Sequence, residues 1–372
     1  MKVLILSVTA GQGHHAAAQA IKQEFESRGA MVEVMDILKY LGKPLYTTVD
    51  QGYRIGIQRI PRQFGHFYHA LQKDSSVRSI ISTITKTPLF SNKLYSCFRD
   101  GKPDVIITTH VLGALILDKM IQKKPFSVRH IGIVTDYTLH PFWEDVKNIE
   151  KLAVCGELIL PRCRQRGLPS EILLPIGIPI EKRFTQSIPK ERARQLLGVN
   201  TELPTALIMS GSMGFGNMAA TVARIAGCGH DLQILCVCGR NIKQKIMLEN
   251  SLHPVPVHVY GFAENIDVML DASDFVVTKP GGLSSSEALS KGKGLILTAP
   301  IPGQEEENSD YLVNAGLAMQ ATKNMPVHEL CMMVIEQPQL LENMRNAAKK
   351  FVPADPAGLL CDYIYNGYLP GE

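Results

Sequence analysis

Short apolar, β-branched runs alternate with helical segments along most of this chain, and this pattern constrains the fold more than any other feature. Such alternation is typical of parallel sheets wrapped by helices, because parallel strands need a crossover that a helix supplies. The first half predicts strands at residues 3–8, 31–35, 104–108, 129–134 and 151–154. The second half predicts strands at residues 205–209, 233–237, 257–260, 275–277 and 295–297. We therefore expect an α/β protein.

The chain divides into two similar halves, each of which opens with a strand, a glycine turn and a helix. Between them, LLPIGIPIEKRF (173–184) holds two prolines and a glycine, which break regular structure as a linker does. We expect one α/β domain at residues 1–176 and another at 177–351, with a C-terminal helix (352–372) that completes the first. Open parallel sheets bind ligands at the carboxyl ends of their strands. Two such sheets facing each other would bring two sets of loops to one cleft.

The composition excludes several classes of protein. The eight cysteines form no CxxC pair, and several lie within apolar runs, which is typical of reduced, buried thiols rather than of disulfides or a zinc site. The amino terminus MKVLILSV is too short for the core of a signal peptide. No stretch approaches the roughly 18 uninterrupted apolar residues of a membrane-spanning helix. We expect a cytoplasmic protein.

Two glycine loops of the second half are candidates for binding phosphate. GSMGFGN (211–217) lets the backbone approach an anion closely, although an ordinary tight turn fits the same residues. Its spacing matches neither GxGxxG nor GxxxxGK[ST], which argues against a dinucleotide fold and a P-loop kinase. In TKPGGLSSSEAL (278–289), Ser284 and Glu287 have the spacing of a capping box at a helix start. Alternatively, Glu287 meets ribose hydroxyls and the glycines face a diphosphate.

Two further loops carry groups that suit a nucleotide-sugar. APIPGQEEENSDYL (299–312) has Gln304 and Glu305 after a strand, where they could hydrogen-bond sugar hydroxyls. A solvated acidic loop is the alternative. YGFAENIDVML (260–270) follows another strand, and its backbone could meet the edge of a base.

Four motifs occur in order: GQGHH (11–15), VTDYTLHPFW (134–143), KPGGLSSSEAL (279–289) and PGQEEEN (302–308). With them the chain resembles, over nearly its whole length, the monogalactosyldiacylglycerol synthases and processive diacylglycerol glucosyltransferases. Those are GT-B enzymes with two facing Rossmann-like domains, related to the GlcNAc transferase that makes lipid II. The resemblance implies inverting, metal-independent sugar transfer from a UDP-sugar to a lipid hydroxyl, with no further cofactor.

The resemblance also implies donor-binding residues in the second half. They are Gly211, Met213, Gly214, Phe262, Lys279, Gly281, Gly282, Ser284, Glu287, Gln304 and Glu305. The first three would lie by the phosphates and Phe262 near uracil. Lys279 and the glycine pair after it would face the diphosphate. Glu287 would meet the ribose, and Gln304 and Glu305 the sugar.

The first half would then supply the acceptor side. The resemblance maps the histidine of a Gly-x-Gly-His motif onto His14, where the helix N-terminus disfavours the imidazolium form; a structural histidine is the alternative. Asp136 follows a strand directly and is our candidate base for the acceptor hydroxyl, with His14 as its partner. A helix N-cap is the alternative for Asp136. His140 and Trp143 would support this site or face lipid.

Residues 39–102 carry the excess positive charge. They contain eleven Lys and Arg and three acidic residues, a net +8, whereas the whole chain carries +4. Interleaved aromatic residues suit an anionic membrane, where each basic residue contributes about 1 kcal/mol; a solvated helical hairpin is the alternative. Such interleaving also serves RNA, but no RRM or KH motif accompanies it, so we expect no nucleic-acid partner. The candidate acceptor and membrane residues are Gly13, Arg54, Arg59, Arg62, Phe64, Phe67, His140 and Trp143.

The sequence thus predicts a peripheral enzyme at the inner face of the cell membrane that moves a hexose from UDP-glucose or UDP-galactose to diacylglycerol. A GlcNAc transferase acting on a polyprenyl-linked intermediate and a UDP-sugar epimerase stay open as other enzymes. A UDP-sugar-binding membrane sensor without turnover is the alternative of a different class. KGKG (291–294) departs from the GVP of relatives, and we expect it to alter a packing turn rather than the site.

Overall fold

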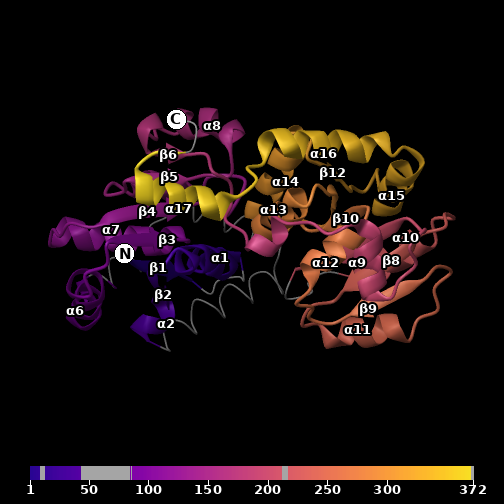
Figure 1. Ribbon diagram of the computed structural model, residues 1–372, viewed down its shortest axis with the longest axis horizontal. Helices are drawn as coiled ribbons and strands as arrows, with labels where there is room; N and C mark the ends of the chain where they lie inside the picture. The colour runs from indigo at the N-terminus through magenta and orange to yellow at the C-terminus, as the bar shows by residue number, and fades with distance from the viewer. Residues whose placement is uncertain (9–12, 43–83, 85, 212–216, 370–372) are drawn as a thin grey trace. The chain divides into compact units, whose positions relative to one another are not determined.

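The computed structural model describes residues 1–8, 13–42, 84, 86–211 and 217–369. The chain forms two compact units (Figure 1). Unit 1 comprises Met1–Lys182, Ile301–Gln304 and Asp355–Glu372, and unit 2 comprises Arg183–Pro300 and Glu305–Ala354. Each unit contains a six-stranded sheet with helices between successive strands, and the predicted α/β class is confirmed.

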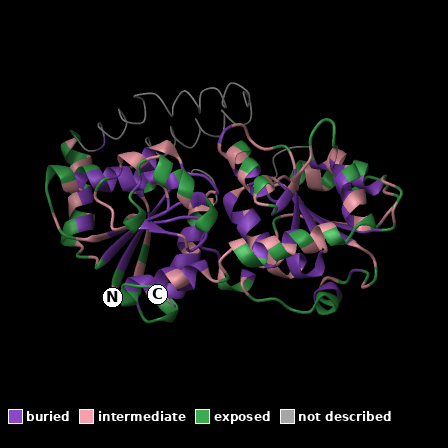
Figure 2. Ribbon diagram, turned by 90° about the horizontal axis from the view of Figure 1, so that it is seen from above, coloured by how far each residue is buried: buried purple, intermediate pink, exposed green. Residues whose placement is uncertain are grey.

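The sheet of unit 1 has the order β2-β1-β3-β4-β5-β6, and every pairing is parallel. Its strands are β1 (Lys2–Ser7), β2 (Met31–Asp36), β3 (Val105–Thr108), β4 (Arg129–Ile133), β5 (Lys151–Ala153) and β6 (Leu173–Leu174). The central strands are mostly apolar because helices cover both faces of the sheet. In Figure 2 most of their length is coloured as buried.

In the part of unit 1 that the structure describes, all helices except α17 lie between successive strands or next to the last strand. The helices are α1 (Gly13–Ser27), α2 (Ile37–Leu41), α6 (Pro88–Tyr95), α7 (Val111–Lys123), α8 (Leu160–Gln165) and α17 (Pro356–Asn366), with the shorter η1 (Ser96–Asp100), η2 (Pro141–Asp145), η3 (Glu157–Ile159) and η4 (Ser170–Ile172). The C-terminal helix α17 packs on α1 and on the sheet. Phe25 of α1 and Leu360 of α17 share one buried core with Ile5 of β1, so the end of the chain is part of unit 1.

The sheet of unit 2 has the order β12-β11-β10-β7-β8-β9, again parallel throughout. Its strands are β7 (Thr205–Met209), β8 (Gln233–Val237), β9 (Val257–Tyr260), β10 (Phe275–Thr278), β11 (Gly294–Leu297) and β12 (Ala318–Gln320). Its helices are α9 (Lys190–Leu197), α10 (Met218–Ala226), α11 (Ile242–Glu249), α12 (Ile266–Ala272), α13 (Gly282–Ser290), α14 (Gln304–Asn314), α15 (Val327–Glu336) and α16 (Gln339–Phe351), and η5 (Lys182–Phe184) lies where the units join in sequence.

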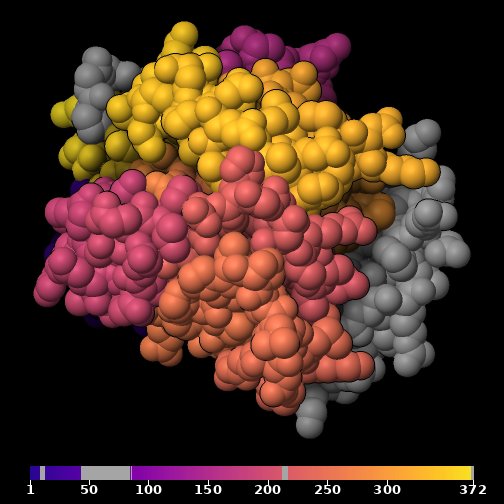
Figure 3. All heavy atoms as spheres, turned by 90° about the vertical axis from the view of Figure 1, so that its right-hand side faces the viewer, coloured from indigo at the N-terminus to yellow at the C-terminus, as the bar shows by residue number. Residues whose placement is uncertain are grey.

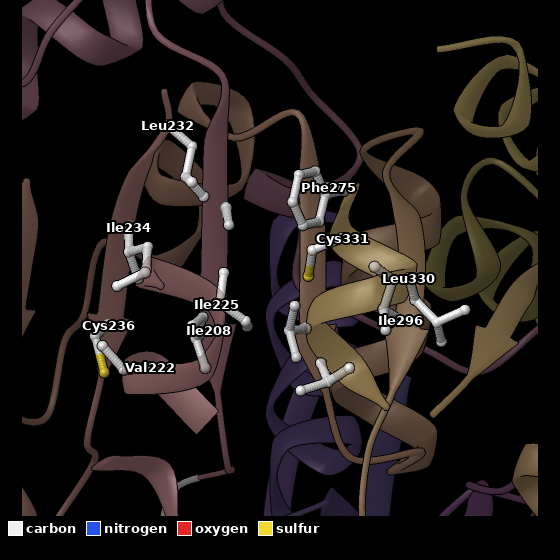
Figure 4. Close-up of a cluster of buried hydrophobic side chains, with 14 of the residues drawn as sticks. Ile208, Val222, Ile225, Leu232, Ile234, Cys236, Phe275, Ile296, Leu330 and Cys331 are labelled. Carbon is white, nitrogen blue, oxygen red and sulfur yellow. The ribbon is translucent and has the colours of Figure 1, made fainter. Parts of the chain in front are cut away.

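The core of unit 2 lies between the sheet and helices α10 and α15. Ile208 and Phe275 of the sheet pack with Val222 of α10 and with Leu330 and Cys331 of α15 (Figure 4). In Figure 3, which shows one face of the molecule, the late part of the chain is drawn in yellow. This part includes α16, whose Met344 joins the same core.

All ten predicted strands are present, and three of them, β7, β8 and β9, have the predicted bounds. The short strands β6 and β12, of two and three residues, were not predicted because so few residues give no periodic signal. Helix α14 begins at Gln304, whereas the sequence analysis treated residues 299–312 as a loop. Three glutamates in its first turn suit the positive end of the helix dipole and extend the helix in this direction.

A buried network lies at the amino-terminal side of the unit 2 sheet, where Lys291 also donates to the carbonyl oxygen of Gln186 near the start of the unit. The Nζ atom of Lys291 lies 2.7 Å from a carboxylate oxygen of Asp271, and their side chains are 2% and 4% exposed. Lys293 donates to the backbone oxygen of Ser273 at 2.9 Å, and burial lowers the pKa of Lys293 to about 8. Both lysines of KGKG (291–294) therefore lie just before β11, where they form buried hydrogen bonds within unit 2.

Candidate active site

In both sheets the direction of chain progression reverses beside the first strand of the unit. In unit 1 the chain passes from β1 to β2 on one side and returns to β3 on the other side of β1. In unit 2 it passes from β7 to β8 and β9, and then returns to β10 on the other side of β7. Open α/β sheets bind ligands outside the carboxyl ends of the strands at such a reversal. The loops that follow β1 and β3, and those that follow β7 and β10, are therefore the candidate sites.

His14 lies in the first turn of α1, directly after the β1 loop, and is half-buried. Its Nδ1 lies 2.7 Å from the carbonyl oxygen of Thr109 and 2.8 Å from Oγ1 of Thr135. A carbonyl oxygen only accepts, so Nδ1 carries the proton and donates it, and Nε2 of the neutral ring carries the lone pair. Burial lowers the pKa of His14, against opposing effects of the Asp136 charge and the Thr109 carbonyl. A pKa below its usual value favours the neutral ring near pH 7.

A second histidine, absent from the sequence-based candidates, lies against His14. His110 is the N-cap of α7, and its ring meets that of His14 edge to face with centroids 4.5 Å apart. Its Nδ1 accepts a hydrogen bond from the backbone N–H of Leu112 at 3.0 Å. Burial lowers its pKa well below the usual value, and His14 and His140 act in the same direction. The signal that could have found it is a histidine two residues after the predicted strand 104–108.

Asp136 and His140 come from the segment after β4. Asp136 is half-buried in a bend, and its charge raises the pKa of His14. The N-cap of η2 is His140, whose Nδ1 accepts from the backbone N–H of Phe142 at 3.2 Å, so Asp136 is not that cap. Burial and the charge of Arg166 lower the pKa of His140 to about 4.

Gly13 is part of a helix, and Trp143 is buried in unit 1. Gly13 is the first residue of α1. Trp143 is buried, and a Cβ atom built on Gly132 of β4 would lie 2.7 Å from its ring. The tryptophan thus packs on the sheet, which fits the supporting role proposed for it and not a lipid-facing one.

In unit 2 the turn after β10 leads directly into α13. The N-cap is Gly281, which has no side chain to serve as a cap, and the helix begins at Gly282. Ser284 therefore lies inside the first turn, and the interpretation of Ser284 and Glu287 as a capping box is wrong. The first N–H groups of a helix have no partner within the helix and attract anions. This end of α13 fits a phosphate better than a self-capped helix would.

Helix α14 fixes the turn between β10 and α13 through a buried hydrogen bond. Asn308 is fully buried, and its Nδ2 donates to the carbonyl oxygen of Pro280 at 3.0 Å. Within the turn, the N–H of Gly281 donates to the carbonyl oxygen of Lys279 at 2.8 Å. Burial lowers the pKa of Lys279, whereas the charge of Glu305 raises it. A cationic side chain, a helix N-terminus and a carboxylate therefore meet at the carboxyl end of β10.

The predicted sugar-binding pair Gln304–Glu305 divides between the units. Glu305 belongs to unit 2 and interacts with Lys279. Gln304 groups with unit 1, where its Nε2 donates to Oγ1 of Thr138 at 2.7 Å. Both residues start α14 and do not lie in a loop.

The remaining described donor candidates lie after β7, β9 and within α13. Gly211 has a φ of +68°, a conformation that suits glycine. Phe262 is 58% exposed after β9, and the guanidinium of Arg240 lies 5.5 Å from the centre of its ring. Arg240 was not predicted. Glu287 is half-buried on α13.

Several predicted residues lie outside the described residues: Met213, Gly214, Arg54, Arg59, Arg62, Phe64 and Phe67. Within the described ranges, no group of three or more His, Cys, Asp or Glu side chains could hold a metal ion. In the same part of the chain, no helix combines the length and apolar character needed to cross a membrane.

Two family models match the chain, one in each half. Residues 14–180 match the monogalactosyldiacylglycerol (MGDG) synthase model, and residues 205–354 match the glycosyltransferase family 28 C-terminal domain. A processive diacylglycerol beta-glucosyltransferase of Bacillus cytotoxicus is 27% identical over 98% of this chain and 93% of its own length. The corresponding protein of Bacillus pumilus is 26% identical over 94% of this chain and 90% of its own length.

Solved structures share the architecture. MurG of Acinetobacter baumannii superimposes with a TM-score of 0.61 at 13% identity, covering 99% of both chains. Anabaena Alr3699/HepE in complex with UDP gives 0.54 at 16% identity, covering 99% of this chain and 100% of the other. With two parallel α/β units, a family 28 domain and these neighbours, the chain is a glycosyltransferase of the GT-B fold. Its first half matches the MGDG synthases, and over nearly its whole length the chain is similar to the processive diacylglycerol glucosyltransferases.

Proposed function

We propose that this protein transfers a hexose from a UDP-sugar to the hydroxyl group of diacylglycerol, with inversion at the anomeric carbon and without a metal ion. Relatives with the name processive diacylglycerol beta-glucosyltransferase, matched over almost the whole chain, support the substrate class. The structural observation that carries the proposal is the neutral His14 beside the charge of Asp136 at the chain reversal of unit 1. An acceptor hydroxyl must lose a proton as it attacks, and these groups can receive it.

In the proposed reaction the acceptor oxygen forms a bond to the anomeric carbon from the face opposite UDP. The bond between that carbon and the β-phosphate oxygen breaks, and its electron pair leaves with UDP. The hydroxyl proton passes to the carboxylate of Asp136, while Nε2 of His14 accepts a hydrogen bond that orients the acceptor. Lys279 and the N–H groups of α13 stabilise the negative charge that develops on UDP.

The other contacts of the donor follow from the same proposal. We propose that Gly211, Met213 and Gly214 bind the phosphates and that Gly281 and Gly282 bind the diphosphate at the start of α13, with Ser284 in its first turn. Phe262 lies against uracil, Glu287 meets the ribose, and Gln304 and Glu305 meet the sugar. We further propose peripheral attachment to the anionic inner face of the membrane through the basic residues of 39–102.

The test is transfer of radiolabel from UDP-glucose, UDP-galactose and UDP-GlcNAc to diacylglycerol in anionic mixed micelles that contain EDTA. We expect a labelled monoglycosyl lipid from one donor. Measurable UDP binding without labelled lipid from any donor would contradict the diacylglycerol acceptor. A product that disappears in EDTA and returns with a divalent cation would contradict metal independence.

Asp136→Ala separates an enzyme from a sensor. We expect loss of transfer with unchanged affinity for UDP, because Asp136 lies in unit 1 and the proposed UDP site in unit 2. The matched control is Asp100→Ala, which removes an exposed carboxylate of the same unit. Transfer at the wild-type rate by Asp136→Ala would exclude this residue as the base.

A further inference from the structure

We propose that His110 is a positioning residue that holds the ring of His14 in the orientation in which Nε2 meets the acceptor. This inference rests on the function proposed for unit 1. The mechanism above assigns no role to His110, yet the residue follows β3, which lies next to β1 in the sheet. Two histidines from neighbouring strand ends thus meet at the chain reversal.

The first support is the contact between the rings. They meet edge to face, with centroids 4.5 Å apart and planes at 76°. This is a favourable aromatic geometry, and it restricts rotation of a ring about its Cβ–Cγ bond. The two orientations of the imidazole of His14 differ by such a rotation, which exchanges the positions of nitrogen and carbon atoms. A ring packed against it therefore helps to select one of them.

The second support is the backbone around His110. The carbonyl oxygen that receives the Nδ1 proton of His14 belongs to Thr109, the preceding residue. Thr109 is fixed on one side because its N–H donates to the carbonyl oxygen of Leu6 at 3.0 Å. It is fixed on the other side because Nδ1 of His110 caps α7 through the N–H of Leu112. His110 thus stabilises both the ring of His14 and the acceptor of its hydrogen bond.

The charged and titratable neighbours agree with this arrangement. His14 faces the Asp136 carboxylate and His110, His110 faces His14 and His140, and His140 faces Arg166. The Nδ1 of His110 accepts a hydrogen bond, so its neutral ring carries the proton on Nε2. A neutral, half-buried ring beside His14 keeps water away from the side of His14 that it covers, without adding a positive charge. This environment favours the neutral state that a hydrogen-bond acceptor requires.

Two substitutions separate the roles of His110. His110→Asn keeps an oxygen that can cap α7, because asparagine is among the best N-cap residues, but it removes the ring beside His14. His110→Phe keeps a ring and removes the cap. The control is His15→Asn, which removes the exposed neighbouring histidine of α1.

For His110→Asn we expect kcat to fall about 10- to 100-fold, as for a misplaced catalytic group, with unchanged affinity for UDP. Water that replaces the ring raises the pKa of His14 toward its usual value, so the acidic limb of the pH profile of kcat moves to higher pH. His110→Phe retains more activity and lowers the thermal midpoint of unfolding. His15→Asn behaves like the wild type. Wild-type kcat together with an unshifted acidic limb in His110→Asn would overturn the inference.

A spectroscopic readout separates failure of this inference from failure of the proposed function. Imidazole ¹⁵N NMR of the unliganded protein should show His14 with its proton on Nδ1, and a mixture of tautomers with a raised pKa in His110→Asn. If the wild type transfers no sugar to diacylglycerol, the proposed function fails, and the NMR result still decides about His110. An unchanged His14 tautomer and pKa in His110→Asn would refute the positioning role.

Discussion

Asn308→Asp tests whether α14 holds the turn that we propose binds the donor diphosphate. The side chain of Asn308 is fully buried, and its Nδ2 donates to the carbonyl oxygen of Pro280 at 3.0 Å. Aspartate has nearly the same shape, but its ionised form has no hydrogen to donate. A carboxylate oxygen would then face the carbonyl oxygen of Pro280, and the turn before α13 would move away from it.

Two limits bound the cost of this substitution. Loss of a buried hydrogen bond costs about 1–3 kcal/mol. A protonated aspartic acid could still donate to Pro280, but keeping it protonated at pH 7, from a usual pKa of about 3.9, costs about 4 kcal/mol. The penalty at pH 7 therefore lies between about 1 and 4 kcal/mol, or between about 5- and 1,000-fold in affinity if it falls on donor binding. It decreases as the pH falls, because protonation restores the donor.

The assay is calorimetric binding of UDP, together with KM for the UDP-sugar, between pH 5 and 8. The matched control is Asn314→Asp on the same helix, where the exposed Asn314 side chain donates to the carbonyl oxygen of Asp310 at 2.7 Å. We expect weaker UDP binding only for Asn308→Asp, with partial recovery at pH 5. A UDP affinity within twofold of the Asn314→Asp value at pH 7 would refute the reasoning.

Three further predictions concern the Asp136–His14 interaction, the buried Lys291–Asp271 pair and the independence of transfer from metal ions. Asp136→Asn removes a charge that raises the pKa of His14. The acidic limb of the pH profile of the residual kcat/KM should therefore move to lower pH. Movement to higher pH would contradict the interaction between Asp136 and His14. Asp271→Ala leaves Lys291 buried without its carboxylate partner. It should lower the free energy of unfolding, measured in urea, by about 3–5 kcal/mol. A loss below about 1 kcal/mol would contradict this, because it would show that water reaches the lysine. Dialysis against EDTA should leave kcat unchanged, and a loss that Mg²⁺ restores would disprove metal-independent transfer.

Much of the fold follows from local patterns in the sequence. Runs such as residues 205–209 and 233–237 are largely apolar and are buried throughout because both faces of a parallel sheet are covered, and they form β7 and β8 with the predicted bounds. Ligands bind at the carboxyl ends of parallel strands, and this rule also indicated Asp136 and, together with the family motif, His14. The N-cap of α13 is Gly281, three residues before Ser284, which was misidentified because the spacing of Ser284 and Glu287 imitates a capping box. Local signals cannot distinguish a helix that caps itself from one whose first turn is open.

By itself the sequence determined the alternation of strands and helices, and so which side chains stand at the ends of strands. Local hydrophobic patterning and turn residues suffice for that, because they act over a few neighbouring positions. Only the tertiary structure decided which strand ends meet. The pairing of β1 with β3 brings His14 and His110 together across 96 positions of the sequence, and α14 returns to hold Pro280 through Asn308. Such contacts depend on the order of strands in the sheet, which the packing of the whole unit sets and no single segment encodes.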